Sequence, residues 1–220
     1  MTSDAPGMTD QITQQSQRGR IRGSYAKGDA RRTQILDAAF EVFATGGFRN
    51  PSMVQIAAAC GVTRMGLVHY FPTKESLLES VLVERDRRAA ELFFAGAPAE
   101  TDDGLAYFTR LLKVAEHNAH NPGIVSLFAV LSTEATDPEH PAHEYFIARY
   151  RRSLERTRLA LANLEGRGLL KAAGRRPGIE AEIIATMDGL QVQWLLDPAA
   201  TPMVDLLRAR LEELIDADLV

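Results

Sequence analysis

Cysteine is almost absent from this chain, because Cys60 is the only one among 220 residues and an intrachain disulfide is therefore excluded. A lone thiol suits a reducing compartment, and its place on the inward face of a turn predicts a buried structural side chain rather than a redox sensor. Apolar runs of membrane-spanning length are also missing, and the polar N-terminus lacks a signal-peptide core. We therefore expect a soluble, cytoplasmic protein.

Motifs of catalysis and metal binding are scarce as well. The sequence has no glycine-rich phosphate loop, no Glu-x-x-His pair and no clear nucleophile beside a base, so we expect neither enzymatic activity nor a cofactor. His117, His120, His140 and His143 are the one group that suggests a metal. Two pairs at i, i+3 spacing near helix ends are more typical of neutral or surface histidines, so we predict no metal site, although the pattern leaves the question open.

Net charge is small, at −4, which is unusual for a protein that binds nucleic acid. The charge is unevenly distributed, however. Residues 18–74 carry nine Lys or Arg against three Asp or Glu, a balance of +6, and the rest of the chain is acidic. Counterion release from DNA needs a local positive face rather than a positive protein. The basic segment therefore predicts the surface that meets DNA.

Hydrophobic residues recur at helical spacing throughout, without strand-like alternation or an internal repeat. We expect about nine helices in an all-α fold. Asp29, Ser52, Thr63 and Thr73 are predicted to cap the first four. Glycine and proline breaks separate them, and the predicted spans are 29–45, 53–59, 64–70, 74–93, 102–119, 122–135, 141–166, 178–196 and 202–216.

The second and third predicted helices have the spacing of a helix-turn-helix. Ala57 is small where the next helix crosses it, and Gly61 supplies a positive φ at the turn. Val62 and Leu67 then return the third helix to the core, which leaves the residues between them free to enter a major groove. We divide the chain into a flexible basic arm at 1–27, a helix-turn-helix domain at 28–76 and a helical ligand-binding and dimerisation domain at 77–220.

The third helix and its neighbours supply the predicted contacts to DNA. The Arg64 fork can take guanine O6 and N7 together, and Met65 can pack on a thymine methyl. Gly66 costs helix stability, so a close approach of backbone to DNA is one motive and tolerated irregularity the other. An ordinary solvated arginine is the alternative for Arg64. The full predicted set is Ser52, Thr63, Arg64, Met65, Gly66, His69, Tyr70 and Lys74.

Several of these residues are predicted to hold phosphates. Ser52 and Thr63 combine a cap with a hydroxyl donor, and His69 and Tyr70 lie at the far end of the third helix, where Tyr70 can equally be part of the core. Arginines at 18–22 can enter an adjacent minor groove, or remain a solvated basic tail.

Beyond residue 77 the sequence indicates a cavity and a dimer interface. Large apolar residues with isolated polar ones can surround a small ligand, and we predict as its lining Phe108, Leu112, Phe128, Leu131, Glu134, Tyr145, Arg149 and Trp194. The apolar faces of the last two predicted helices are broad enough to pair with those of a second copy, although packing within one chain is the alternative. The predicted interface is Ile183, Met187, Leu190, Trp194, Val204, Leu207, Leu211 and Leu214.

Residues 31–78 resemble the DNA-binding domain of the tetracycline-repressor (TetR) family. The similarity lies in ILDAA at 35–39, GGF at 46–48, the segment 52–64 and LVHYFPTKESLL at 67–78. The resemblance implies a homodimeric transcriptional regulator, usually a repressor that a small molecule releases from a palindromic DNA operator. It also implies that Lys74 binds a phosphate, as does its place in the first turn of a helix.

Two other functions remain open at this stage. A constitutive DNA-binding regulator would have the same head but no effector, and a helical enzyme with an accessory DNA-binding domain would need a catalytic group that the sequence does not show. The operator, the effector, the regulated genes and the choice between repression and activation are not encoded in any motif.

Overall fold

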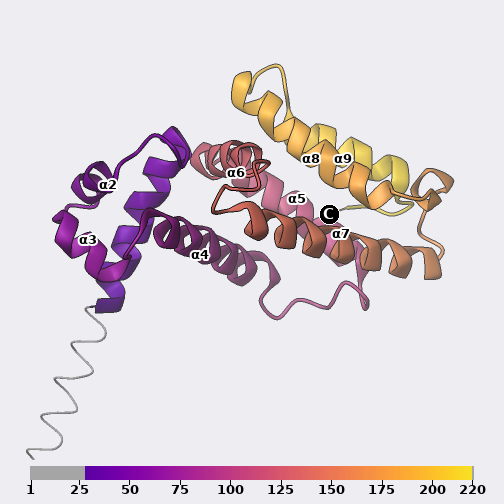
Figure 1. Cartoon of the computed structure of the whole chain (residues 1–220). Helices are drawn as coiled ribbons and strands as arrows, with labels where there is room; N and C mark the ends of the chain where they lie inside the picture. Colours follow the sequence, from indigo (N-terminus) through magenta and orange to yellow (C-terminus); the bar gives the residue numbers. More distant parts are fainter. Residues whose placement is uncertain (1–27, 220) are drawn as a thin grey trace, which may run out of the picture.

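The structure, a computed structural model, describes residues 28–219, and the predicted all-helical fold is confirmed over that range. The predicted basic arm at 1–27 lies outside the described residues. Within 28–219, ten helical segments follow one another, and Leu170 and Ile215 form an isolated antiparallel bridge. Figure 1 shows how the helices are arranged. The segments are a helix at 28–46, α2 Met53–Ala59, α3 Arg64–Tyr70, α4 Lys74–Phe94, α5 Gly104–Ala119, α6 Pro122–Glu134, α7 His143–Gly166, a 3-10 turn Ala172–Arg175, α8 Ile179–Leu196 and α9 Met203–Leu214.

Side-chain caps start the short helices where the sequence predicts them. The hydroxyls of Ser52, Thr63 and Thr73 each accept a hydrogen bond from the main-chain N–H three residues later, which satisfies a donor that the helix itself leaves free. The predicted cap at Asp29 is wrong, because Gly28 before it is already helical. The Asp29 carbonyl instead accepts the Thr33 hydroxyl within the helix.

Two glycines set the turns of the N-terminal part. Gly47 ends the first helix at φ 65° and Gly61 lies in the α2–α3 turn at φ 61°, as predicted for Gly61. Cys60 is buried beside it, with its thiol 3.6 Å from the Ile35 carbonyl, and burial raises the pKa of the thiol. The prediction of a buried structural cysteine is thus confirmed.

The hydrophobic interior forms two clusters. The first fills the space under the helix at 28–46, α2 and α3, called the head from here on, and continues through the first half of α4 to Leu127, Leu131 and Phe146. The second lies among α5, α7, α8 and α9. The first cluster therefore crosses the boundary predicted after residue 76, and α6 is packed on the head as well as on α8.

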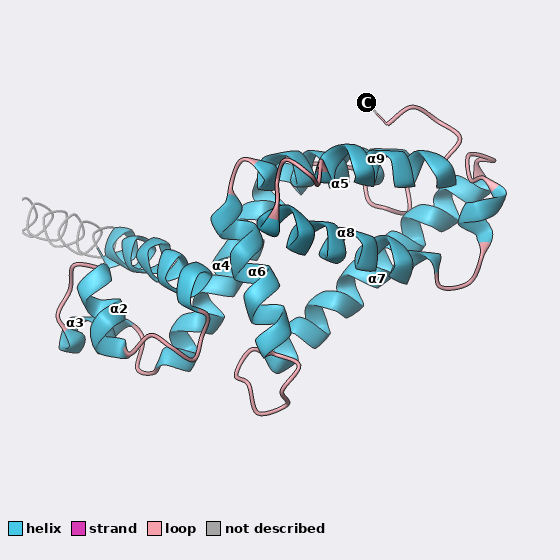
Figure 2. Ribbon diagram, turned by 90° about the horizontal axis from the view of Figure 1, so that it is seen from above, coloured by secondary structure: helices cyan, strands magenta, loops and turns pink. Residues whose placement is uncertain are grey.

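Helices α5 to α9 form the larger, C-terminal part, called the core domain (Figures 1 and 2). Helix α5 packs on α7 and α9, α6 packs on α8, and α8 packs on α9. Helix α4 leaves the head and runs into the core domain, so it belongs to both parts (Figure 1). Within 28–219, none of the helices has the length and apolar character needed to span a membrane.

Candidate nucleic-acid interface and interior cavity

Helix α3 presents a free outer face because its inner face is fully anchored. Leu67 is 0% exposed and Phe71, just beyond the helix, is also buried. Arg64 and His69 are exposed, and Met65 is 75% exposed, which is unusual for a large apolar side chain. The three side chains lie at the first and last turns of α3, free for an external partner.

The geometry at the N-terminus of α3 explains why residue 66 is a glycine. A Cβ at this position would lie 3.2 Å from Thr63 Oγ1, the atom that accepts the Gly66 N–H at 3.0 Å. Glycine therefore keeps the cap uncrowded whatever the helix meets outside. The motive of close approach to DNA stays a prediction, and crowding at the cap is a further motive that the sequence alone does not suggest.

Two other predicted contacts, Ser52 and Tyr70, have partners inside the head. Ser52 Oγ donates to Gln55 Oε1 at 2.9 Å, so its proton is engaged in the capping box. Tyr70 is partly buried against the first cluster, and its ring meets His69 edge-to-face at 5.4 Å. Tyr70 therefore contributes packing as well as an exposed edge.

Lys74 lies in the first turn of α4, as predicted, and its side chain is engaged by groups of the head. Its ammonium donates to the carbonyls of Phe48 at 2.8 Å and Pro51 at 3.0 Å, with Arg49 O at 3.4 Å, and it lies 4.4 Å above the Phe48 ring. An ammonium has three protons, and these carbonyls use all of them. Lys74 therefore braces the loop before α2 in this structure, and a phosphate could be held only by breaking those bonds.

Two arginines that the sequence analysis counted only as charge prove to brace the head. Arg31 Nη2 donates to the Gly61 carbonyl at 2.9 Å, which fixes the turn of the helix-turn-helix. The Arg32 guanidinium lies 5.0 Å above the Phe71 ring and also reaches Ser80 on α4. The partners of Arg31 and Arg32 lie far away in the sequence, so no short stretch of residues predicts these contacts.

A cavity of about 610 Å³ lies among α4, α5, α6, α7 and α8. Of the predicted lining residues, Phe128 and Arg149 line it. Phe108, Leu112 and Leu131 are instead fully packed, and Glu134, Tyr145 and Trp194 also lie outside the lining. The sequence shows which residues are apolar but not which face of a fully buried helix meets a void, so these six assignments are corrected.

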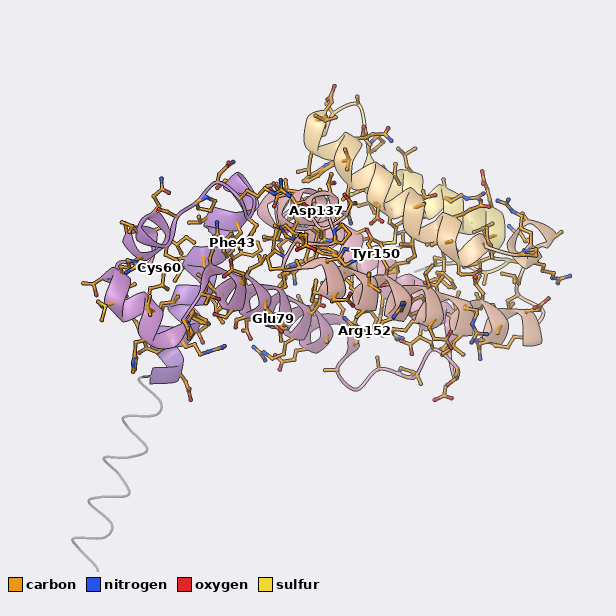
Figure 3. The ribbon with its side chains drawn as sticks, in the orientation of Figure 1. Phe43, Cys60, Glu79, Asp137, Tyr150 and Arg152 are labelled. Carbon is orange, nitrogen blue, oxygen red and sulfur yellow. The ribbon has the colours of Figure 1, made fainter. Side chains whose placement is uncertain are left out.

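The polar residues of the cavity wall were mostly missed. Asp86 on α4 accepts from Tyr145 Oη at 2.8 Å, pairs with Arg149, and lies 3.8 Å from Arg152. The Arg149 guanidinium also lies 4.2 Å above the Phe128 ring. This network joins α4 to α7 across the cavity, and Figure 3 shows Arg152 on α7.

A second polar pair joins α7 to α8. Tyr150 Oη donates to Asp188 Oδ2 at 2.8 Å. Figure 3 labels Tyr150 on α7. Burial raises the pKa of the Asp188 carboxyl, and burial together with the nearby Asp188 charge raises the pKa of Tyr150 to about 12. Asp188 forms no ion pair with any described residue, so it is a costly group to keep in a cavity wall.

The predicted dimer interface divides into two groups. Ile183, Leu207, Leu211 and Leu214 are covered by their own chain, so these four predictions are corrected to intrachain core, the alternative that the sequence left open. Met187 lines the cavity and Leu190 is almost buried, whereas Trp194 and Val204 are half-buried. The exposed apolar side chains of α8 and α9 are Val192, Leu196 and Leu206.

The histidines predicted to form a group each have local partners. His120 Nδ1 lies 2.8 Å from the Glu116 carbonyl and His143 Nδ1 lies 2.8 Å from the Ala135 carbonyl, while His117 meets the Phe93 ring at 5.4 Å. Within 28–219, no three metal-ligating side chains come together.

The head and the end of α6 meet at a junction of five side chains. Phe48 N donates to Glu134 Oε2 at 2.9 Å, and the buried His140 ring meets the Phe48 ring edge-to-face at 5.2 Å. Arg49 pairs with Asp137 at 2.6 Å in the loop after α6 (Figure 3). The junction is polar and specific, and only Glu134 among its members was a predicted site residue.

Comparison with known proteins identifies the head. Residues 35–81 match the family model described as bacterial regulatory proteins, tetR family. The head is a TetR-family domain. The regulator UidR of Escherichia coli K12 is 37% identical over 62 residues, which are 28% of this chain and 32% of UidR. The chain thus matches about a third of the length of such curated relatives.

Solved structures extend the likeness to the core domain. NalD, the secondary repressor of the MexAB-OprM multidrug efflux pump in Pseudomonas aeruginosa, matches with a TM-score of 0.64 at 26% identity, over 86% of this chain and 98% of that one. A putative transcriptional regulator from Saccharomonospora viridis, in complex with choline, matches with a TM-score of 0.69 at 19% identity, over 86% of this chain and all of that one. The TetR-family head is therefore joined to a core domain of the same fold as theirs.

Proposed function

We propose that this protein is a ligand-responsive, DNA-binding transcriptional regulator without enzymatic activity, most simply a repressor. The observation that carries the proposal is that α4 and α6 each contribute to both parts of the molecule. Arg85, Asp86 and Phe94 of α4 and Phe128 of α6 line the cavity, while the first turn of α4 braces the head through Lys74. A ligand in the cavity thus touches the two helices on which the head rests.

The DNA contact is assigned to α3. Arg64 and Met65 are exposed at its first turn and His69 at its last, and the capped N-terminus favours anions. One such helix reads only a few base pairs, so useful specificity requires two heads. We assign the pairing to α8 and α9, on which the large apolar side chains of Val192, Leu196 and Leu206 are exposed in a single chain.

Two connections can carry the signal. Movement of α4 displaces Lys74 and the loop before α2, and movement of α6 displaces Glu134, which holds the Phe48 N–H. Either shift changes the separation of the two α3 helices in a dimer and so breaks the spacing that two half-sites demand. The regulator from Saccharomonospora viridis in complex with choline and the complex of SmeT with triclosan, both similar in fold to this chain, support a small molecule as the ligand.

The proposal is tested by selecting duplexes from a random pool with the full chain and measuring their affinity. We expect an enriched palindrome that binds far more tightly than scrambled duplex, and an Arg64→Ala variant that loses about 1–3 kcal/mol and relaxes one base position in each half-site. Lys113→Ala, on the core domain, serves as the control. Equal weak binding to every duplex, or a monomer at the binding concentration, contradicts the proposal.

A constitutive regulator is the second candidate function. It is favoured if the selected duplex is never released by any cavity ligand. The cavity, which is mostly apolar with a few polar side chains, speaks against it, because a purely structural core is normally close-packed.

A further inference from the structure

Arg85 is the one arginine of the cavity wall that has no acidic partner among the described residues. The other three are paired: Arg149 and Arg152 with Asp86, and Arg156 with Glu100. The Arg85 guanidinium forms neither an ion pair nor a hydrogen bond with residues 28–219, and its Nε is shut off from solvent. A buried N–H such as Nε is costly to leave without an acceptor, so a ligand atom that accepts from it is favoured.

The side chains of the cavity wall together also carry a net positive charge. Four arginines and two aspartates line the cavity, and Glu100 neutralises Arg156 from behind. One positive charge remains unmatched even when Asp188 is fully ionised. Burial is the main cause that lowers the pKa of Arg85; the charge of Arg149 adds to this effect, and the nearby charge of Asp86 opposes it.

The same wall contains a second unsatisfied atom. Asn118 on α5 is 7% exposed, and its Oδ1 has no hydrogen-bond partner in the described part of the chain. Most of the remaining lining is apolar and suited to a hydrocarbon body, including Leu111, Val114, Ile124, Phe128, Ile184 and Met187. The cavity therefore offers one cationic anchor, one acceptor and a broad apolar surface.

On the basis of the proposed function, we propose that the effector is an organic monocarboxylate with an apolar body, whose carboxylate pairs with Arg85. The guanidinium fork matches a carboxylate in a bidentate arrangement, and the single unmatched charge calls for one negative charge rather than two. Asn118 Oδ1 can accept a hydrogen bond from a hydroxyl or N–H of the same ligand.

A cationic ligand is the competing class, because Asp188 also lacks an ion-pair partner among the described residues. Cation recognition uses open aromatic faces, however, and three of the five aromatic rings that line the cavity already have an arginine over them. The Arg156 guanidinium lies 4.4 Å above the Phe94 ring and 5.8 Å from the Tyr107 ring centre, and Arg149 covers Phe128. Asp188 moreover accepts from Tyr150, whereas Arg85 makes no hydrogen bond or ion pair with residues 28–219. The anion is therefore favoured.

The test compares ligands that differ only in their head group, measured by calorimetry on the full chain without DNA. The probes are naphthoate, naphthamide and naphthylmethylamine, and octanoate, octanamide and octylamine. We expect a carboxylate to bind at least about tenfold more tightly than its amide, as one charge-assisted pair supplies. Arg85→Gln should remove that preference and leave the amide affinity unchanged, whereas Arg85→Lys should retain part of it.

Arg87→Gln is the matched control, since Arg87 lies on the same helix, pairs with Glu84 and Glu91 and does not line the cavity. It should keep the full carboxylate preference. The proposal is overturned if amide or amine binds as tightly as the carboxylate, if neither carboxylate binds at millimolar concentration, or if Arg85→Gln keeps the preference. These measurements contain no DNA, so their outcomes are separate from a failure of the proposed function. That failure would appear in a different experiment, as a carboxylate that binds the protein but does not release it from the selected duplex.

Discussion

The main-chain N–H of Phe48 donates a 2.9 Å hydrogen bond to the Glu134 carboxylate, which joins the end of the first helix to the end of α6. Gly47 beside it is confined by the same carboxylate, because a Cβ there would lie 2.6 Å from Glu134 Oε1. His140 completes the junction, with Nε2 3.5 Å from Glu134 Oε2. One acidic side chain thus aligns the head with a helix of the cavity wall.

Replacing Glu134 should weaken both stability and coupling. Glu134→Ala leaves the Phe48 N–H without its partner, so we expect a loss of about 1–3 kcal/mol in the free energy of unfolding. Glu134→Gln keeps an acceptor and should lose less. Glu139→Ala, exposed in the same loop, is the control and should unfold as the parent does. Denaturant unfolding measures all three, and equal midpoints for Glu134→Ala and Glu139→Ala would contradict the assignment.

Acid should weaken the same junction through His140. Burial lowers its pKa below the usual 6.5, although Glu134 and Asp137 oppose this shift and Arg49 adds to it. Its Nδ1 accepts the Ala142 N–H, which a protonated ring cannot do.

The folded state therefore binds this proton less tightly than the unfolded chain does. The contribution of His140 to stability is full above about pH 6.5 and declines as the pH falls below it. His140→Asn keeps an acceptor without titrating, so its unfolding midpoint should change less between pH 7 and pH 5. His69→Asn on the exposed end of α3 is the control, and an unchanged pH profile in His140→Asn would refute the prediction.

A substitution of Lys74 distinguishes its bracing of the loop before α2 from phosphate binding. If it braces the loop before α2, Lys74→Met should cost about 1–2 kcal/mol of stability and weaken operator binding without changing its dependence on salt. A lost phosphate contact would instead lower the salt slope by about one. Arg49→Met, next to the same loop, provides the comparison. A reduced slope with unchanged stability in Lys74→Met would restore the role that the family resemblance implied.

Two glycines on facing helices should respond in opposite ways to alanine. A Cβ at Gly104 would collide with the Ala160 carbonyl oxygen on α7, so Gly104→Ala should destabilise the core domain by about 1–3 kcal/mol. A Cβ at Gly166, the last residue of α7, meets nothing within 4 Å. Gly166→Ala should be neutral or slightly stabilising. Thermal unfolding of the two variants checks the close approach of α5 to α7, which similar melting temperatures would exclude.

Helix limits were the part of the fold most open to prediction. Ser52, Thr63 and Thr73 act within three residues of themselves, so their effect can be read from a short window. The cap predicted at Asp29 was wrong because residues that favour caps also occur inside helices. Whether such a residue is a cap depends on whether the residue before it is helical. In the core domain, Leu207 and Leu211 show the limit of periodicity, which identifies a buried face without saying what covers it.

The two candidate sites also differ in how far neighbouring residues predict them. The exposed edge of α3 could be located because Leu67 and Gly61 define it locally, whereas the cavity wall required contacts between residues far apart in sequence. Asp86 with Arg149, Tyr150 with Asp188 and Phe48 with Glu134 are examples. None of these pairs leaves a pattern in the order of the residues.

The chain order alone therefore specified which segments coil, where they stop and which short helix faces outward, since those properties depend on a few neighbouring side chains. Folding in three dimensions decided which arginine lacks a counter-charge, which lysine is engaged by carbonyls and how the head is held to the core domain. Such properties depend on electrostatic and packing partners brought close by the whole structure, and a charge has no assigned role until its partners are in place.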